Sequence, residues 1–446
     1  MQRNILQSLR IWSKKVTRKP LLLRGARQVG KTWLVRELGK SFETFVEFNL
    51  EAQPELHKHF LSSFGKPESL VKLLEAESGE TIRPSSTLLF IDEVQECPEA
   101  ILALRYFKEK MPDLHVIAAG SLVEFALREL SFPVGRIETM HVFPLSFAEY
   151  LSARGKSDLR MSLAAESDQA VCEQLHGMLL EELRLFMLIG GMPEVVAQFV
   201  GSGAIETAQA TQQQLVTNFR LDFSKYASRA KIPHVRKVFD EVPRQLGRKF
   251  VYSHVAADVR SRELGAALSL LEEAGVVSRA FHSSGNGVPL SAESAINLFK
   301  VYLVDIGLCN RLLGLRLSQE LALRPELIVN RGGMAEQFVA QELLALTPPD
   351  AIPALHYWHR EERSAQAEVD FLFELDHQVL PIEVKSGTSS KTKSLRLFMR
   401  EKESGIGVCL SGSTLALDES IRRIPLYRVD QMADILRQGL LAPKDS

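Results

Sequence analysis

Gly25-Ala26-Arg27-Gln28-Val29-Gly30-Lys31-Thr32 is a glycine-rich loop that follows a short apolar run, Leu21–Leu23, and precedes a segment with a helical pattern, residues 33–40. A strand, the loop G-x-x-x-x-G-K-[ST] and a helix, in this order, are typical of a phosphate-binding P-loop. Glycine permits backbone conformations that turn successive N–H groups towards phosphate oxygens, and the helix N-terminus adds partial positive charge. We therefore expect the whole loop to bind ATP, with Lys31 at the β- and γ-phosphates and Thr32 offering its hydroxyl to Mg²⁺.

A second motif, Thr-Leu-Leu-Phe-Ile-Asp-Glu at residues 87–93, combines an apolar run with two acids. The apolar run predicts a buried parallel strand, and acids at its carboxyl end lie where open α/β sheets bind ligands. Asp92 is then expected to hold the Mg²⁺ shell, and Glu93 to act as general base on the attacking water. Together with the loop, this motif predicts a P-loop NTPase with a parallel sheet.

Two further residues have open interpretations. Ser121 ends the apolar run 114–120 and is either a sensor of the γ-phosphate or the N-cap of a following helix over residues 122–130. Arg136 follows Gly135 before another strand and is either an arginine finger, in its own subunit or a neighbouring one, or an ordinary surface residue.

The segments G-x-R-Q-V-G-K-T, L-F-I-D-E-V-Q, A-G-S-L and V-F-P-L-S-F-x-E-Y, all within residues 25–150, resemble the AAA-superfamily ATPase domain of a large prokaryotic family of ATPases. Members of that family carry a C-terminal domain of unknown function, and the resemblance extends over nearly the whole chain. It implies an AAA-type P-loop ATPase domain at residues 1–155.

Composition limits the other possibilities. The chain has 446 residues and a net charge of −1, so a surface that binds DNA or RNA has to be a local basic patch. The four cysteines are widely spaced, which is typical of a reducing cytoplasm. No uncharged apolar run approaches the ~20 residues of a transmembrane helix. We therefore expect a cytoplasmic protein without a membrane partner.

The middle of the chain is predicted to be helical. Residues 156–231 are interpreted as a helical lid or linker, in which Gly190–Glu194 forms either a hinge near the nucleotide or a plain turn between helices. Residues 232–325 are interpreted as a winged helix, with wing strands at Gly275–Phe281 and Asn297–Leu303. The region is locally basic, through Arg244, Arg248, Lys249, Arg260, Arg262 and Arg279. DNA contact and protein contact both remain open for this region.

The last part, residues 326–446, contains Asp370, then Glu383-Val-Lys385 across an apparent hairpin, and Glu336 on an upstream helix. This set resembles the PD-(D/E)xK restriction-endonuclease-like core. Two carboxylates in such a set hold Mg²⁺, so Asp370 and Glu383 are candidate metal ligands, and Glu336 is a candidate to complete the metal shell. Lys385 is a candidate for positioning or activating the attacking water. An active nuclease and a non-cleaving module remain equally open.

The expected architecture is α/β: a P-loop NTPase sheet, a helical and winged-helix region, and an α/β restriction-endonuclease-like domain. The expected function is ATP hydrolysis that couples nucleotide state to a nuclease-like domain acting on nucleic acid. The alternative is a non-cleaving switch that acts through contacts with a protein partner. A homo-oligomer is compatible with either.

Overall fold

The computed structural model describes residues 2–128, 135–165, 170–315, 331–360, 367–387, 391–418 and 420–441. Its N-terminal part is built on a five-stranded sheet with the order β2-β3-β4-β1-β5, in which all neighbouring strands are parallel. The strands are β1 (Leu21–Arg24), β2 (Thr44–Asn49), β3 (Thr87–Asp92), β4 (His115–Ala119) and β5 (Glu138–His141). The helices of this part are α1 (Ile5–Lys14), α2 (Lys31–Gly39), α3 (His57–Ser62), α4 (Pro67–Ser78), α5 (Pro98–Lys110) and α6 (Val123–Leu127).

The position of β1 brings the loop to the same edge of the sheet as the carboxyl ends of β3 and β4. β3 and β4 are buried along their whole length, and separate apolar clusters cover the two faces of the sheet. Strand β1 lies between β4 and β5, so consecutive strands of the sequence are separated at this point. The carboxyl ends of β1, β3 and β4 therefore meet at one edge, where open α/β sheets bind their ligands. This is the P-loop NTPase architecture that the two motifs predict.

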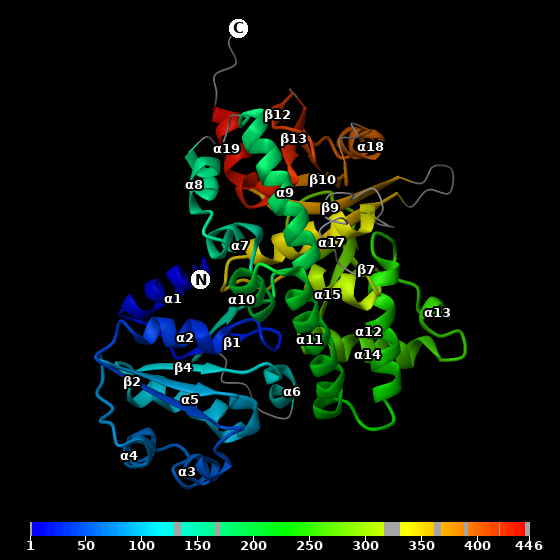
Figure 1. Cartoon of the computed structure of the whole chain (residues 1–446). Helices are drawn as coiled ribbons and strands as arrows, with labels where there is room; N and C mark the ends of the chain where they lie inside the picture. Colours follow the sequence, from blue (N-terminus) through cyan, green and yellow to red (C-terminus); the bar gives the residue numbers. More distant parts are fainter. Residues whose placement is uncertain are drawn as a thin grey trace.

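A bundle of helices follows the sheet (Figure 1). The helices are α7 (Phe147–Ala153), α8 (Ser157–Ala165), α9 (Glu173–Ile189), α10 (Pro193–Ser202), α11 (Ile205–Tyr226), α12 (Ile232–Glu241), α13 (Tyr252–Val255), α14 (Ser261–Glu273) and α15 (Ile306–Leu312). The predicted turn at Gly190–Glu194 separates α9 from α10: Gly190 has a φ of +81°, and Pro193 begins α10.

The rest of the chain forms a mixed sheet of eight strands in the order β12-β13-β11-β10-β9-β8-β6-β7. The strands are β6 (Val277–Ser283), β7 (Ser294–Leu303), β8 (Leu355–His359), β9 (Glu368–Leu375), β10 (Gln378–Val384), β11 (Gly407–Ser411), β12 (Ala416–Leu417) and β13 (Ile421–Pro425). The accompanying helices are α17 (Arg331–Leu346), α18 (Lys393–Glu401) and α19 (Met432–Leu441). Short 3₁₀ turns lie at Pro54–Leu56, Val94–Glu96, Val242–Gln245, Leu290–Glu293 and Leu426–Gln431.

The two wing strands predicted for the winged helix form as β6 and β7 and pair as a hairpin, but this hairpin is part of the larger sheet. β6 pairs with β7 on one side and, in parallel, with β8 on the other, with Phe281 opposite His356. One contiguous apolar core extends from Leu145 to Leu436. The middle and C-terminal regions are therefore packed as one body. The predicted boundary between residues 325 and 326 lies outside the described residues, and the domain limits stay a prediction.

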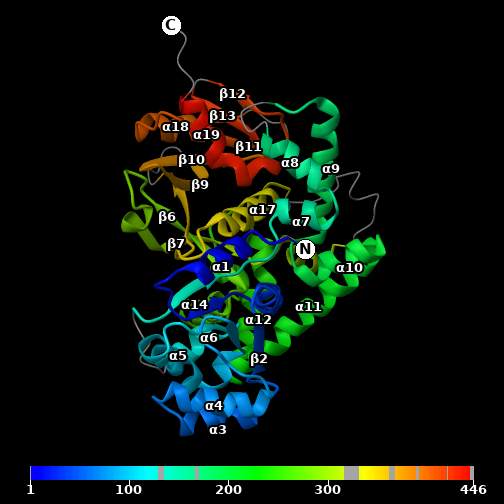
Figure 2. The same ribbon diagram turned by 90° about the vertical axis from the view of Figure 1, so that its left-hand side faces the viewer.

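Two views at right angles show an elongated molecule (Figures 1 and 2). The strands β11 to β13 lie at one end, α3 and α4 lie at the other, and α17 lies between them. Among the described residues, no helix is long and apolar enough to span a membrane.

Candidate functional site

The P-loop joins β1 to α2, and its backbone has the conformation that the motif requires. Gly25 and Gly30 have φ values of +145° and +95°, and Gln28 has a φ of +65°. A Cβ atom at Gly25 would lie 2.2 Å from the carbonyl oxygen of Val142, so no larger residue fits there. Since the first N–H groups of an α-helix lack intrahelical partners, the start of α2 at Lys31 presents donors to an anion.

Lys31 is held inside the loop. Its Nζ donates hydrogen bonds of 2.9 Å to the carbonyl oxygens of Gly25 and Ala26. Burial lowers the pKa of Lys31 to about 8, although Glu93 and Asp92 counteract part of the shift. The present partners of this ammonium group are neutral carbonyl groups. A bound triphosphate would place negative charge beside it and so favour its charged form.

The two expected Mg²⁺-binding side chains already meet. Thr32 donates a hydrogen bond from Oγ1 to Oδ2 of Asp92 at 2.7 Å, and the other oxygen of Asp92 accepts from the N–H of Glu93 at 3.0 Å. Burial raises the pKa of Asp92, and the Thr32 hydrogen bond opposes this shift. A hydroxyl and a carboxylate are the hard oxygen donors that Mg²⁺ prefers, so these residues fit the ion.

Glu93 begins the segment after β3 in a strained conformation. Its φ and ψ of 49° and 46° lie in the left-handed region, which is uncommon for a residue with a Cβ atom. Its carboxylate accepts a hydrogen bond of 2.7 Å from the side-chain amide of Gln95. Strain of this kind is often found at functional sites, and it directs the Glu93 side chain independently of the strand that precedes it.

Residues from three other parts of the chain contact the P-loop. Arg3, just before α1, donates to the Val29 carbonyl oxygen at 3.0 Å, and its guanidinium also pairs with Glu149 of α7. Arg27 pairs with Asp222 of α11 through Nη1 and Oδ1 at 2.5 Å. A Cβ atom at Gly275, in the turn between α14 and β6, would lie 3.0 Å from the backbone nitrogen of Ala26.

Ser121 lies beside the start of the loop. It is buried and lines a cavity of about 370 Å³ together with Gly25, Ala26 and Arg279. The helix α6 begins at Val123 with Leu122 in the N-cap position, so Ser121 is not the N-cap. The predicted end of that helix, residues 129 and 130, lies outside the described residues. The role of Ser121 as a sensor of the γ-phosphate stays a prediction.

Arg136 does not reach the P-loop of its own chain. It precedes β5, at the edge where the parallel strands begin, and its Nε lies 3.1 Å from Oε1 of Glu109 in the last turn of α5. The P-loop lies at the opposite edge. A role in the nucleotide site of a neighbouring copy stays a prediction.

The structure brings the predicted C-terminal residues together. In the β9–β10 hairpin Ile382 lies opposite Phe371, so Glu383 follows at the position opposite Asp370. The N–H of Val384 donates to Oδ2 of Asp370 at 2.7 Å, and Lys385 pairs with Glu383. The sequence interpretation of the hairpin is therefore confirmed, while the metal-binding roles stay predictions.

A residue that the motif did not include lies among these acids. Lys300 of β7 has a side chain that is 1% exposed, and its Nζ lies 3.0 Å from Oε2 of Glu336, 2.5 Å from Oε1 of Glu368 and 3.7 Å from Oδ1 of Asp370. Tyr302 also donates to Oε2 of Glu336 at 3.3 Å. We call Lys300, Glu336, Glu368, Asp370, Glu383 and Lys385 the carboxylate centre.

The ionisation of the centre follows from its burial. Burial would lower the pKa of Lys300, but the surrounding tyrosine and carboxylates outweigh it and hold the pKa well above its ordinary value. Burial raises the pKa of Glu336 to about 8 and that of Glu383 to about 7, and in both cases Asp370 adds to the effect. The ammonium of Lys300 is thus charged, and it uses carboxylate oxygens that a metal ion would need. Within the described part of the chain, no group of three or more His, Cys, Asp or Glu side chains is arranged to hold a metal ion. The centre, as it stands, does not fit a divalent cation.

Sequence reasoning missed Lys300, although a signal was present. Lys300 lies in the run Phe299-Lys300-Val301-Tyr302-Leu303, where apolar neighbours predict a buried strand. A lysine there needs an anionic partner, because an unpaired buried charge is costly. No signal in the sequence indicated that Asp222 and Arg3 contact the P-loop, because these contacts depend on the packing of segments that are distant in sequence.

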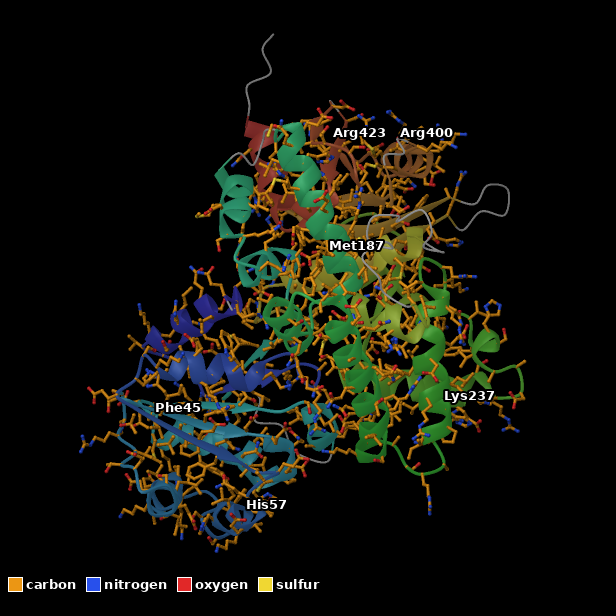
Figure 3. All side chains as sticks on the ribbon, in the orientation of Figure 1. Phe45, His57, Met187, Lys237, Arg400 and Arg423 are labelled. Atoms are coloured by element: carbon orange, nitrogen blue, oxygen red, sulfur yellow. The ribbon has the colours of Figure 1, made fainter. Side chains whose placement is uncertain are left out.

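The basic residues of the middle region are partly neutralised by ion pairs. Arg244 pairs with Glu241 at 3.2 Å, and Arg279 pairs with Glu272. Arg248, Lys249, Arg260 and Arg262 are exposed. Figure 3 shows Lys237 on α12, on the side of the molecule away from Phe45 and the parallel sheet. DNA contact by this region stays a prediction.

Comparisons with known proteins agree with the description of the N-terminal sheet and its P-loop. The family described as AAA domain matches residues 17–151, which supports an AAA-type ATPase domain there. Residues 180–319 and 331–429 match two further families, each described only as a domain of unknown function.

Curated relatives are uncharacterized. The proteins Rv2008c of Mycobacterium tuberculosis and Mb2031c of Mycobacterium bovis are each 26% identical over 384 residues, which is 84% of this chain and 72% of theirs. Among solved structures, the Walker-type ATPase PABY2304 of Pyrococcus abyssi is 16% identical, with a TM-score of 0.45, over 70% of this chain and 96% of that one. The Aeropyrum pernix ORC1 protein in complex with DNA is 13% identical, with a TM-score of 0.28, over 74% of this chain and 94% of that one.

Proposed function

We propose that this chain binds Mg²⁺–ATP at residues 25–32 and hydrolyses it. The observation that carries the proposal is the 2.7 Å hydrogen bond between Thr32 and Asp92, which joins the P-loop to the acid at the end of β3. The two motifs are 60 residues apart in sequence, and each is weaker evidence alone than the pair in contact. The family match over residues 17–151 supports the same conclusion.

The roles of the residues follow from their positions. The N–H groups of the loop and of the α2 N-terminus bind phosphate oxygens, and Lys31 exchanges its two carbonyl partners for the β- and γ-phosphates. Glu93 orients the attacking water and accepts its proton. Mg²⁺, when bound by Thr32 and Asp92, supplies neutralisation of the charge on the phosphate oxygens.

The test is ATP turnover by the full chain. Lys31→Ala is expected to lower turnover by about 10²–10³-fold, since it removes a donor and a charge from the transferred phosphoryl group. Lys40→Ala is the matched control, because Lys40 follows the same helix and has a side chain that is 72% exposed. Unchanged turnover in Lys31→Ala would refute the assignment.

We further propose that the nucleotide state of the loop is transmitted to the eight-stranded sheet. Two contacts support this: the Arg27–Asp222 ion pair connects the loop to α11, and Gly275 packs against Ala26 in the turn that leads directly into β6. A loop that rearranges around a triphosphate has to change or strain these contacts.

The purpose of this coupling has two candidates. Nucleic-acid cleavage is favoured by the convergence of Glu336, Asp370, Glu383 and Lys385, as in a PD-(D/E)xK core. A non-cleaving switch that contacts a protein partner is favoured by Lys300, which already neutralises part of the centre.

Cleavage of plasmid and single-stranded DNA separates the two. The assay uses Mg²⁺ or Mn²⁺, with and without ATP, and compares the native chain with Asp370→Ala. Cleavage by the native chain alone supports a nuclease. No cleavage by the native chain, or equal cleavage by the variant, would rule out the nuclease and support the non-cleaving switch.

A further inference from the structure

Lys300 has the surroundings of a bound cation. Its ammonium group is reached by oxygens of three carboxylates, from Glu336 on α17 and from Glu368 and Asp370 on β9. The Lys300 side chain is 1% exposed, and those of Glu336 and Asp370 are 10% and 13% exposed, whereas that of Glu368 is 35% exposed. Water therefore has little access to the ammonium group, although it reaches Glu368 at the margin. A small positive group enclosed by hard oxygen donors on several elements is also how proteins hold Mg²⁺ and Mn²⁺.

We propose that the Lys300 ammonium occupies the cation position of the carboxylate centre, so that the centre binds a divalent cation only when this ammonium is removed or withdrawn. Lys300 lies on β7, which is part of the β6–β7 hairpin. The predicted motif lies on other strands, β9 and β10. This inference goes beyond the proposed ATP hydrolysis and does not depend on it.

The remaining donors define the class of cation. Without Lys300, the nearest oxygens are those of Glu336, Glu368 and Asp370. Glu383 lies opposite Asp370 in the β9–β10 hairpin: its side chain is 10% exposed, and its Oε2 is buried without a hydrogen-bond partner in the described part of the chain. A set made only of carboxylate oxygens selects Mg²⁺ or Mn²⁺ rather than Zn²⁺, which favours nitrogen and sulfur ligands.

The charge balance explains why the ammonium stays in place. Glu336 and Asp370 are largely buried and lie close to Glu368, and these acids would repel one another without a cation. Lys300 offsets this repulsion at the centre, while Lys385, with a side chain that is 26% exposed, pairs with Glu383 at the margin. The two lysines therefore have different roles, although the motif includes only Lys385.

The experiment titrates Mn²⁺ into the nucleotide-free full chain and measures bound ion from the loss of the free-ion electron paramagnetic resonance signal. The native chain is expected to show no ion bound at the centre. Lys300→Met keeps the length of the side chain without its charge, and it is expected to bind a single Mn²⁺ at the centre, at least about tenfold more tightly than any Mn²⁺ binding detected for the native chain. Lys402→Met removes a partly exposed lysine that donates a hydrogen bond to Asn286, away from the carboxylate centre, and is expected to behave like the native chain.

Two double variants locate the ion. Lys300→Met with Asp370→Asn is expected to lose the Mn²⁺, whereas Lys300→Met with Asp92→Asn is expected to keep it, which excludes the P-loop as its site. Thermal unfolding supplies an independent measure: Mn²⁺ should raise the Tm of Lys300→Met and leave that of the native chain unchanged.

Two outcomes overturn the proposal. One is Mn²⁺ binding by the native chain that Asp370→Asn abolishes, because the cation position would then be available beside Lys300. This arm needs only the native fold, so it decides the question even if Lys300→Met does not fold without the ion. The other is a folded Lys300→Met chain that binds no Mn²⁺.

Discussion

At the scale of single residues, Glu93 is the side chain to which the proposed hydrolysis assigns the attacking water. Its left-handed backbone, at a φ of 49°, costs of order 1–3 kcal/mol and persists because β3 and the following turn hold it. A conformation of this cost next to Asp92 is consistent with a role in positioning water. The strain could not be predicted from the sequence, which shows only two adjacent acids after an apolar run.

Glu93→Gln is expected to retain ATP binding and to lower hydrolysis by about 10²–10⁴-fold, since the amide keeps the shape but cannot accept the proton. Binding of a fluorescent ATP analogue and single-turnover hydrolysis measure the two effects separately. Glu96→Gln, at an exposed position in the same turn, is the control. Equal loss of binding and hydrolysis in Glu93→Gln would assign Glu93 to the structure of the site instead.

Asp305 provides a prediction for pH dependence. It is buried at the start of α15, and it accepts hydrogen bonds from the N–H groups of Gly191 at 2.6 Å and Leu308 at 3.0 Å. Burial raises the pKa of Asp305 to about 6, although these N–H groups oppose the shift. The folded state therefore holds this proton more tightly than the unfolded state, and the stability it contributes falls as pH rises from about 4 to about 6.

The free energy of unfolding of the native chain should therefore fall, relative to that of Asp305→Asn, as the pH rises. We expect the native chain to lose about 1–3 kcal/mol relative to the variant between pH 4 and pH 7. Denaturant unfolding at several pH values measures it. A difference that stays constant with pH would show that Asp305 does not titrate in this range.

At the scale of elements, the turn between α14 and β6 is where the ATPase part meets the rest of the chain. Gly275 has a φ of +69° and lies against Ala26. The interface continues through the Lys225–Glu51 ion pair at 2.6 Å and the stacked rings of Phe125 and Tyr226, whose centroids are 5.0 Å apart. The sequence predicted both wing strands. It could not predict that the turn before them contacts the P-loop, because that contact depends on how two separately folded segments pack.

Gly275→Ala tests the contact with a matched control. Gly79 ends α4 with a φ of +72° and has no atom within 4 Å of an added Cβ. Both alanine variants should lose about 1–2 kcal/mol of stability, since both place a Cβ in the left-handed region. Only Gly275→Ala should also weaken ATP binding, because its Cβ crowds the Ala26 nitrogen. Unfolding and ATP titration measure the two effects, and equal ATP affinities in the two variants would argue against the contact.

At the scale of the whole molecule, the sequence predicted local patterns better than the way in which they are connected. The P-loop, the acids after β3 and the β9–β10 hairpin are local patterns, and the structure places each as expected. The continuous sheet and the core from Leu145 to Leu436 are not local, and the sequence suggested separate domains instead. Lys300 reaches the carboxylate centre only because β6 and β7 join the C-terminal sheet.

This sheet provides a short physical connection between the two sites. Gly275 contacts the P-loop, β6 begins two residues later, and Ala280 of β6 lies opposite Lys300 of β7 in the strand register. A connected path is not by itself coupling, so the claim needs a measurement in which one site is perturbed and the other is observed.

Hydrogen–deuterium exchange with a non-hydrolysable ATP analogue makes that measurement. Bound triphosphate should slow exchange in the P-loop and α2, and also in the turn at 274–276 and in β6 and β7, because the turn contacts the loop, β6 follows the turn and β7 pairs with β6. The far strands β12 and β13 should not change. Lys31→Ala should abolish both the near and the remote effects, and Gly79→Ala should preserve them. Slowed exchange confined to residues 24–39 would show that the nucleotide site and the carboxylate centre work independently, even though one sheet lies against both.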